Sequence, residues 1–209
     1  MGAIPKSNLP GHRRLHERAT LALDRCQESE DVDFKESADW KTLIWRITHS
    51  ALGMGNLRDG GIIVIGVAER GDSWDLTGVT AAHLATYDVD LITAHVNAYV
   101  SPHADVDVVV VDHRDGRQYL AIYVREFRDT PLVCKKNGPD KSGIVEGKVY
   151  VRLPAPPRTT AVTHAQQMHD LLELAAEKRA RKLLETARRV GLVEDRSGTD
   201  AFDEELEGL

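Results

Sequence analysis

Two stretches of this sequence decide its fold. The first is acid-rich and reads Glu28-Ser-Glu-Asp-Val-Asp33-Phe-Lys-Glu-Ser37, and the second reads Asn56-Leu-Arg-Asp-Gly-Gly61-Ile-Ile-Val-Ile-Gly66-Val67. Apolar and polar residues alternate over 32–35, which predicts a short strand with one polar face. The apolar run at 62–67 has no such alternation, which predicts a central strand covered on both faces. If the two strands are neighbours, the carboxylates of the first stretch approach Glu69, which follows the second.

Helices and further strands are predicted on either side of this pair. A helix at 12–26 precedes it, and a helix capped by Ser37 connects its two strands. Short helices are expected at 80–85 and 88–100 and a long one at 163–190. Strands are expected at 74–79, 106–112, 118–126, 131–134 and 148–153. An Asp-Gly turn is expected to join the strands at 106–112 and 118–126 into a hairpin. Pro154, Pro156 and Pro157 are expected to end the sheet. The predicted class is α+β, a mixed β-sheet of five to six strands flanked by helices, with a long C-terminal helix.

Length and composition are those of one domain with extensions. The chain has 209 residues, of which 42% are hydrophobic, and this is enough for a packed core. No apolar run approaches the ~20 residues of a membrane span, and the N-terminus lacks the apolar stretch of a signal peptide. Cys26 and Cys134 are too few for a disulfide framework or a cysteine-rich zinc site. We therefore expect a cytoplasmic protein with no membrane partner and no zinc.

Charge is segregated along the chain. Residues 194–209 carry seven acids and one base, which equals the whole net charge of −6. Residues 1–25 carry five bases and two acids, and residues 177–189 carry six bases and two acids. Basic ends on a neutral body are compatible with nucleic-acid binding. The basic helix either follows a phosphate backbone, with Lys178, Arg181 and Lys182 as its contacts, or is a solvated helix face.

The two stretches resemble the Schlafen AlbA_2 domain family, formerly described as divergent AAA-4. Gly78-Val79, Pro131 and Val149-Tyr-Val-Arg152 continue the resemblance in order, over roughly residues 28–172. The resemblance implies nucleic-acid binding. It also points to vertebrate relatives that look like metal-dependent ribonucleases acting on transfer and ribosomal RNA, which pair two related lobes in one chain.

The resemblance implies three catalytic and metal-binding acids. By position these are Glu28, then Asp33 where the family usually has Glu, and then Glu69, because the usual Gly-Val-Asp-Asp appears as Gly66-Val67-Ala68-Glu69. Asp72 is the alternative third acid. Three clustered carboxylates would hold Mg²⁺ or Mn²⁺, which stabilises charge at a phosphate and activates a nucleophile. The plain alternative is a set of solvated acids.

Glu28 and Asp33 can meet only if the chain between them is not a regular strand. Residues five apart on one regular strand point to opposite faces, so Glu28 and Asp33 converge only if residues 28–31 form a loop or bulge. Lys35 shares the face of Asp33 and either contacts a phosphate oxygen or forms an ion pair there. Arg152 likewise serves a phosphate or a structural pair. A P-loop motif is absent, so we expect no ATP site.

The leading hypothesis is therefore a metal-dependent endoribonuclease of Schlafen type acting on structured RNA such as tRNA. The alternative is a non-catalytic DNA- or RNA-binding module, a regulator or a subunit of a larger complex. Because the chain has one lobe, we expect a homodimer. The predicted divisions are an N-terminal helical extension (1–27), the AlbA_2-like domain (28–172), a basic helical extension (173–193) and an acidic tail (194–209).

Overall fold

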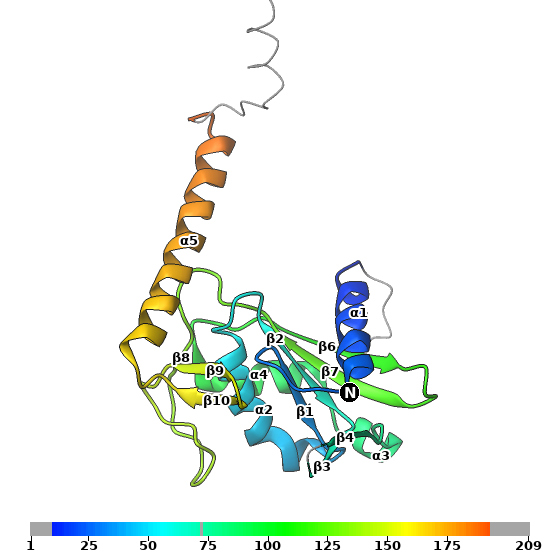
Figure 1. The fold of residues 1–209 in the computed structure, drawn as a ribbon. Coiled ribbons are helices and arrows are strands. Elements are labelled where there is room, and N and C mark those ends of the chain that lie inside the picture. Colours follow the sequence, from blue (N-terminus) through cyan, green and yellow to red (C-terminus); the bar gives the residue numbers. More distant parts are fainter. Residues whose placement is uncertain (1–9, 72, 193–209) are drawn as a thin grey trace, which may run out of the picture.

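The computed structural model describes residues 10–71 and 73–192, and the predicted acidic tail and Asp72 lie outside this part. Figure 1 shows helices packed around one twisted sheet, with a long helix rising from the body. The elements are α1 (Pro10–Arg25), β1 (Val32–Lys35), α2 (Trp40–Met54), β2 (Gly61–Ile65), β3 (Val67–Arg70), β4 (Ser73–Leu76), α3 (Ala81–Leu84), α4 (Val89–Tyr99), β5 (Val100–Ser101), β6 (Val106–Asp112), β7 (Gln118–Val124), β8 (Val133–Cys134), β9 (Tyr150–Pro154), β10 (Pro157–Ala161) and α5 (Ala165–Arg189).

The main sheet is mixed and has the strand order β1-β2-β7-β6. β1 runs parallel to β2 and pairs Asp33 with Ile63, while β7 is antiparallel to both β2 and β6. All five residues of β2 are buried. The predicted central strand and the predicted hairpin at residues 106–126 are confirmed.

Both faces of the sheet are covered, and the alternation along β2 assigns its side chains to two cores. Ile62 and Val64 pack with α1 in one core. Ile63 and Ile65 pack with α2 and α4 in the other. A strand buried on both faces needs apolar residues at every position, which is why this run shows no polar alternation.

The α+β class is confirmed, but the main sheet has four strands rather than five to six. Three two-stranded sheets, β3–β4, β5–β8 and β9–β10, hold the other strands. Gly66 separates β2 from β3, whereas residues 62–67 were expected to form one strand. It has a φ of +111°, and an added Cβ would lie 2.8 Å from the backbone of Gly78. Only glycine suits this conformation and this close approach.

Two local predictions were wrong. The proline-rich segment does not end the sheet, because β9 and β10 form a hairpin in which Pro154 pairs with Pro157. Proline is tolerated there because a two-stranded hairpin has free edges. Asp39, not Ser37, caps α2 by accepting a hydrogen bond of 2.8 Å from the Thr42 N–H. Ser37 instead contacts the ring of His83 at 2.9 Å.

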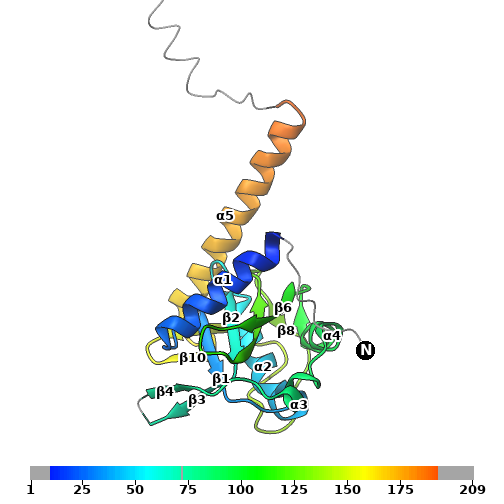
Figure 2. The ribbon, with the colours of Figure 1, turned by 90° about the vertical axis from the view of Figure 1, so that its right-hand side faces the viewer.

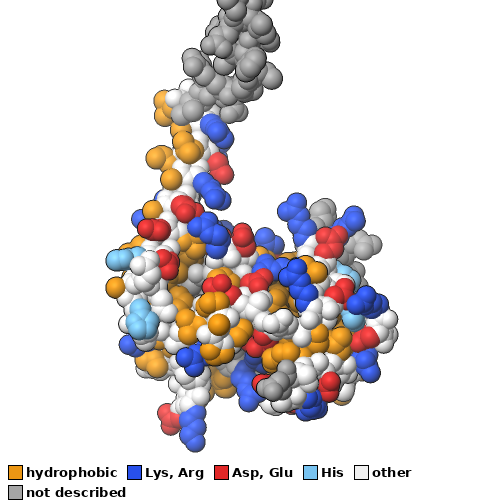
Figure 3. Space-filling view, in the orientation of Figure 1, with side chains coloured by type: hydrophobic (Ala, Val, Ile, Leu, Met, Phe, Trp, Pro, Cys, Tyr) orange, Lys and Arg blue, Asp and Glu red, His pale blue; other side chains and the backbone are white. Residues whose placement is uncertain are grey.

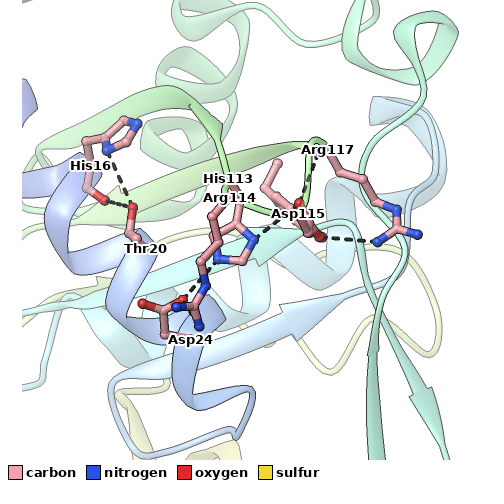
Figure 4. A network of polar contacts seen from close by, with 8 residues as sticks. His16, Thr20, Asp24, His113, Arg114, Asp115 and Arg117 are labelled. Carbon is pink, nitrogen blue, oxygen red and sulfur yellow. Dashed lines mark hydrogen bonds and ion pairs between the residues drawn. The ribbon is translucent and has the colours of Figure 1, made fainter.

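α1 is tied to the β6–β7 hairpin by a network of charged groups (Figure 4). His113 is buried, and its Nε2 lies 3.1 Å from Asp24 while its Nδ1 lies 3.2 Å from Asp115. Asp115 also accepts a hydrogen bond of 2.6 Å from the hydroxyl of Tyr119. These contacts fix the C-terminal end of α1 and so place Arg25 beside the site described below.

The buried residues of α5, Leu171, Leu174 and Ala175, all lie in its first half. Its second half projects away from the body (Figure 1), and Leu183 is 70% exposed there. In Figure 3, hydrophobic side chains gather on one side of this projecting half and basic side chains on the other. No helix in the described part of the chain is both long and apolar enough to cross a membrane.

Candidate nucleic-acid interface

A cleft of about 1260 Å³ opens beside β1. The β3–β4 and β9–β10 hairpins lie on the same side of the molecule (Figure 2), and residues of both line the cleft. Side chains from the end of α1, the segment 27–28, β1 and α2 complete the lining. Five separate segments of the chain therefore meet at this one cleft, because the end of α1 runs directly into residues 27–28.

A turn at residues 29–32 brings the first two predicted acids together. Ser29 and Val32 exchange backbone hydrogen bonds of 3.2 Å, which folds the chain back on itself. The Glu28 carboxylate then accepts a hydrogen bond of 2.7 Å from the Phe34 N–H, beside the Asp33 carboxyl group. The loop that the sequence required for convergence is present.

Asp33 is held ionised at the bottom of the cleft. Its side chain is 7% exposed, and its Oδ2 accepts hydrogen bonds from Lys35 Nζ and, at 2.7 Å, from Ser50 Oγ. Arg152 Nη1 lies 3.6 Å from its Oδ1. Burial alone would raise the pKa of Asp33, but the charges of Lys35 and Arg152 outweigh it and the pKa is lowered.

Glu28 has the opposite behaviour. Burial raises its pKa to about 7; the Asp33 charge adds to this, while the Phe34 N–H and Lys35 oppose it. The two neighbouring carboxyl groups therefore differ in protonation near neutral pH, because Lys35 and Arg152 form ion pairs with Asp33, whereas burial outweighs the effect of Lys35 on Glu28.

Arg152 reaches the acid turn from β9. Its side chain is 2% exposed. It donates hydrogen bonds of 3.0 to 3.3 Å to the carbonyl groups of Glu30, Ser29 and Val32. These contacts make Arg152 a clamp on the turn, which corresponds to the structural alternative for this residue.

Glu69 lies on β3 and lines the same cleft, with an exposed side chain. Its neighbour Ala68 is fully buried. Within residues 10–71 and 73–192, no group of three or more His, Cys, Asp or Glu side chains could hold a metal ion. The structure thus joins Glu28 to Asp33 and leaves Glu69 apart. A metal held by this pair would take its other ligands from water or from substrate.

A polar row on α2 was missed by the sequence reasoning. Arg46, His49 and Ser50 line the cleft, and Gly53 continues the row at the i, i+3, i+4, i+7 spacing of one helix face. Burial lowers the pKa of His49, whose ring packs edge-on against Tyr150 at 5.2 Å. The signal was available, because these four residues share the spacing of one helix face in the sequence.

Three exposed arginines line the cleft from three different elements. Arg25 ends α1, Arg46 lies on α2 and Arg158 lies on β10. None of them forms an ion pair with another residue of the described ranges. Trp74, on β4, lines the cleft as well.

The basic residues predicted on α5 lie away from this cleft. Lys178 forms an ion pair of 2.8 Å with Glu126, and Lys182 forms one of 2.9 Å with Asp129. Arg181 is exposed. Of the five predicted nucleic-acid contacts, only Lys35 and Arg152 line the cleft.

Comparisons with known proteins found solved structures that are similar to parts of this chain at low sequence identity. One similar structure is the DIP2311 protein from Corynebacterium diphtheriae, with 16% identity and a TM-score of 0.47, covering 75% of this chain and 28% of that one. Another is the N-terminal domain of a RecG-related protein from Nitrosomonas europaea, with 18% identity and a TM-score of 0.37, covering 60% of this chain and 81% of that one. This chain spans little more than a quarter of the length of the first. No curated protein matches the chain.

The Schlafen AlbA_2 family matches residues 28–155, which begin at the first acid of the cleft and end in the turn between β9 and β10. This is more than half of the chain, and it includes both strands and the helix between them from which the resemblance was first inferred. The chain belongs to the Schlafen AlbA_2 family.

Proposed function

We propose that this protein binds nucleic acid in the cleft beside β1, with the phosphate backbone on its arginines. The observation that carries this proposal is the meeting of Arg25, Arg46 and Arg158 in one cleft without ion-pair partners in the described chain. Guanidinium groups match phosphate geometry and bind it in a bidentate manner. Membership of the AlbA_2 family supports the same function, as the resemblance implied.

Binding of this kind has a salt dependence that can be tested. Each phosphate contact releases condensed counterions, so the logarithm of affinity falls with the logarithm of salt concentration. Losing one arginine contact is expected to reduce that slope by about 1. Anisotropy of a labelled RNA or DNA oligonucleotide, measured between low and moderate salt, gives the slope directly.

The variants for this test are Arg46→Ala and Arg158→Ala, with Arg128→Ala as the matched control. Arg128 is 74% exposed and pairs with Asp105 outside the cleft. We expect weaker binding and a smaller slope for the two cleft variants and no change for the control. Equal effects of all three substitutions would contradict binding in this cleft.

The second candidate function is more specific than binding: metal-dependent cleavage of structured RNA such as tRNA. The convergence of Glu28 and Asp33 beside Lys35 favours it, because paired carboxylates are ligands for Mg²⁺ or Mn²⁺. A bound divalent ion would supply charge stabilisation at the scissile phosphate. Glu28 must be deprotonated to bind it, and its raised pKa couples metal binding to proton release.

Cleavage is tested with total tRNA and Mn²⁺ or Mg²⁺, beside EDTA, Glu28→Gln and Asp33→Asn samples. Fragments that disappear with EDTA and in both variants, while circular dichroism shows each variant folded, would support the nuclease. Intact RNA that still binds with the salt dependence described above would leave the binding module as the function.

A further inference from the structure

Trp74 has a different environment from the other two tryptophans of the chain. Trp40 and Trp45 belong to the core between the sheet and α2, where their rings pack edge-on against His95. Trp74 is half-buried and lines the cleft that holds Arg25, Arg46 and Arg158. Of the three, only Trp74 is placed to meet a ligand.

The ring of Trp74 is held in place before any ligand arrives. Its centroid lies 5.4 Å from that of the buried Phe34, with the planes at 68°, an edge-to-face contact. In the β3–β4 hairpin Trp74 pairs with Glu69, and its carbonyl accepts a hydrogen bond of 3.3 Å from Cys26 Sγ. A fixed ring loses little entropy when it stacks on a ligand, so it forms a ready platform.

The arginines of the cleft come mainly from other elements than this platform. Arg46 belongs to α2 and Arg158 to β10, whereas Trp74 belongs to the β3–β4 hairpin. A nucleic-acid strand whose phosphates contact Arg46 and Arg158 can therefore direct a base toward Trp74. In a duplex both faces of a base are covered by its neighbours, so only an unpaired base offers a free face to an aromatic ring.

We infer that the cleft takes single-stranded nucleic acid, with one unpaired base stacked on Trp74 and the phosphates on the arginines. This inference rests on the proposed function and adds the substrate class to it. A loop or an overhang of a structured RNA meets the same requirement. Duplex without unpaired bases can reach the arginines but not the ring.

The test measures binding of the full chain to three probes, a 12-nucleotide single-stranded RNA, the DNA of the same sequence and the blunt RNA duplex. Trp74→Leu is expected to weaken binding of both single strands by about 5- to 150-fold, the range for loss of one stacked base. Its effect on the duplex is expected to be less than about twofold, since no base stacks there. Trp74→Phe should keep most of the affinity because it keeps an aromatic face.

Intrinsic fluorescence gives a second readout that does not depend on stability. Single strands should quench the wild-type emission and leave Trp74→Phe unquenched, whereas the matched control Trp45→Phe should retain the quenching. This comparison decides the matter even if Trp74→Leu fails to fold.

The outcomes separate the two proposals. Binding that is equally tight for duplex and single strands, with no quenching lost in Trp74→Phe, would overturn the stacking inference and show that Trp74 only covers Phe34. The proposed nucleic-acid binding would survive that result. Absence of binding to all three probes would overturn both.

Discussion

At the residue scale, Glu28 links the site to pH. Its pKa is about 7 in the folded state and ordinary in the unfolded state, so the folded protein holds its proton more tightly. The stability this gives is full below the unfolded pKa and is lost as pH rises toward 7, since folded Glu28 must then ionise against burial.

We expect Glu28→Gln, which mimics the protonated form, to be nearly neutral at pH 5 and stabilising at pH 8. Because the side chain is partly solvated, about 1–2 kcal/mol is a reasonable gain. Urea unfolding at both pH values measures it. Glu36→Gln is the control, since Glu36 also lines the cleft but is exposed. The same change in stability at both pH values would contradict the assignment.

Arg152 should be among the most sensitive residues of the chain. Arg152→Met takes the side-chain donor away from the carbonyl groups of Ser29, Glu30 and Val32 and removes a cation from buried Asp33. Breaking a buried pair in this way costs about 3–5 kcal/mol. Arg158→Met, at an exposed position of the neighbouring strand, should change stability by less than about 0.5 kcal/mol. Chemical denaturation compares them, and similar small losses for both would show that the clamp is unimportant.

At the scale of the elements, the sequence predicts those strands and turns whose own residues carry the signal. The apolar run of β2 and the Asp115-Gly116 turn each report directly on their own backbone, so the central strand and the hairpin were predictable. The break at Gly66 was not predictable, because it depends on the approach of Gly78 from the segment that follows β4. The β9–β10 hairpin was not predictable either. Prolines predict the end of a sheet unless the strand is known to be an edge strand, and the sequence does not show which strands are at an edge.

The candidate site divides in the same way. Glu28, Asp33 and Lys35 lie within one motif, and their convergence followed from a single condition on the turn. The row on α2 was readable from helical spacing. Arg158 and Trp74 reach the cleft only through the placement of two hairpins, and no spacing in the sequence reports that placement.

The joint between β2 and β3 gives a test at this scale. Gly66→Ala combines an unfavourable φ with a contact of 2.8 Å to backbone, and a loss of more than about 2 kcal/mol is expected. Gly71→Ala is the matched control, because Gly71 also has a positive φ, of 62°, but has nothing within 4 Å of an added Cβ. It should lose only about 1 kcal/mol. Thermal unfolding compares the two variants. Equal losses of stability would mean that the backbone near Gly66 shifts to accept the added Cβ.

At the scale of the whole molecule, a single lobe raises the question of its partner. The vertebrate relatives that the resemblance points to pair two related lobes, so we propose that two copies of this chain form the equivalent pair. Light scattering at micromolar concentration should then give about twice the chain mass of 23.2 kDa. A monomeric mass across the concentrations used for RNA binding would contradict this, and the cleft of one copy would then act alone.

The clamp by Arg152 also governs the order in which the protein can be assembled during its synthesis. Its partners precede it by 120 to 123 residues, so they leave the ribosome long before it does. Until residue 152 emerges, the nascent chain has the two acids but lacks the guanidinium that fixes the turn between them. Such long-range closure is among the slower events of folding. The turn between the acids can therefore be clamped only after residues 25–74 of the cleft lining have been synthesised.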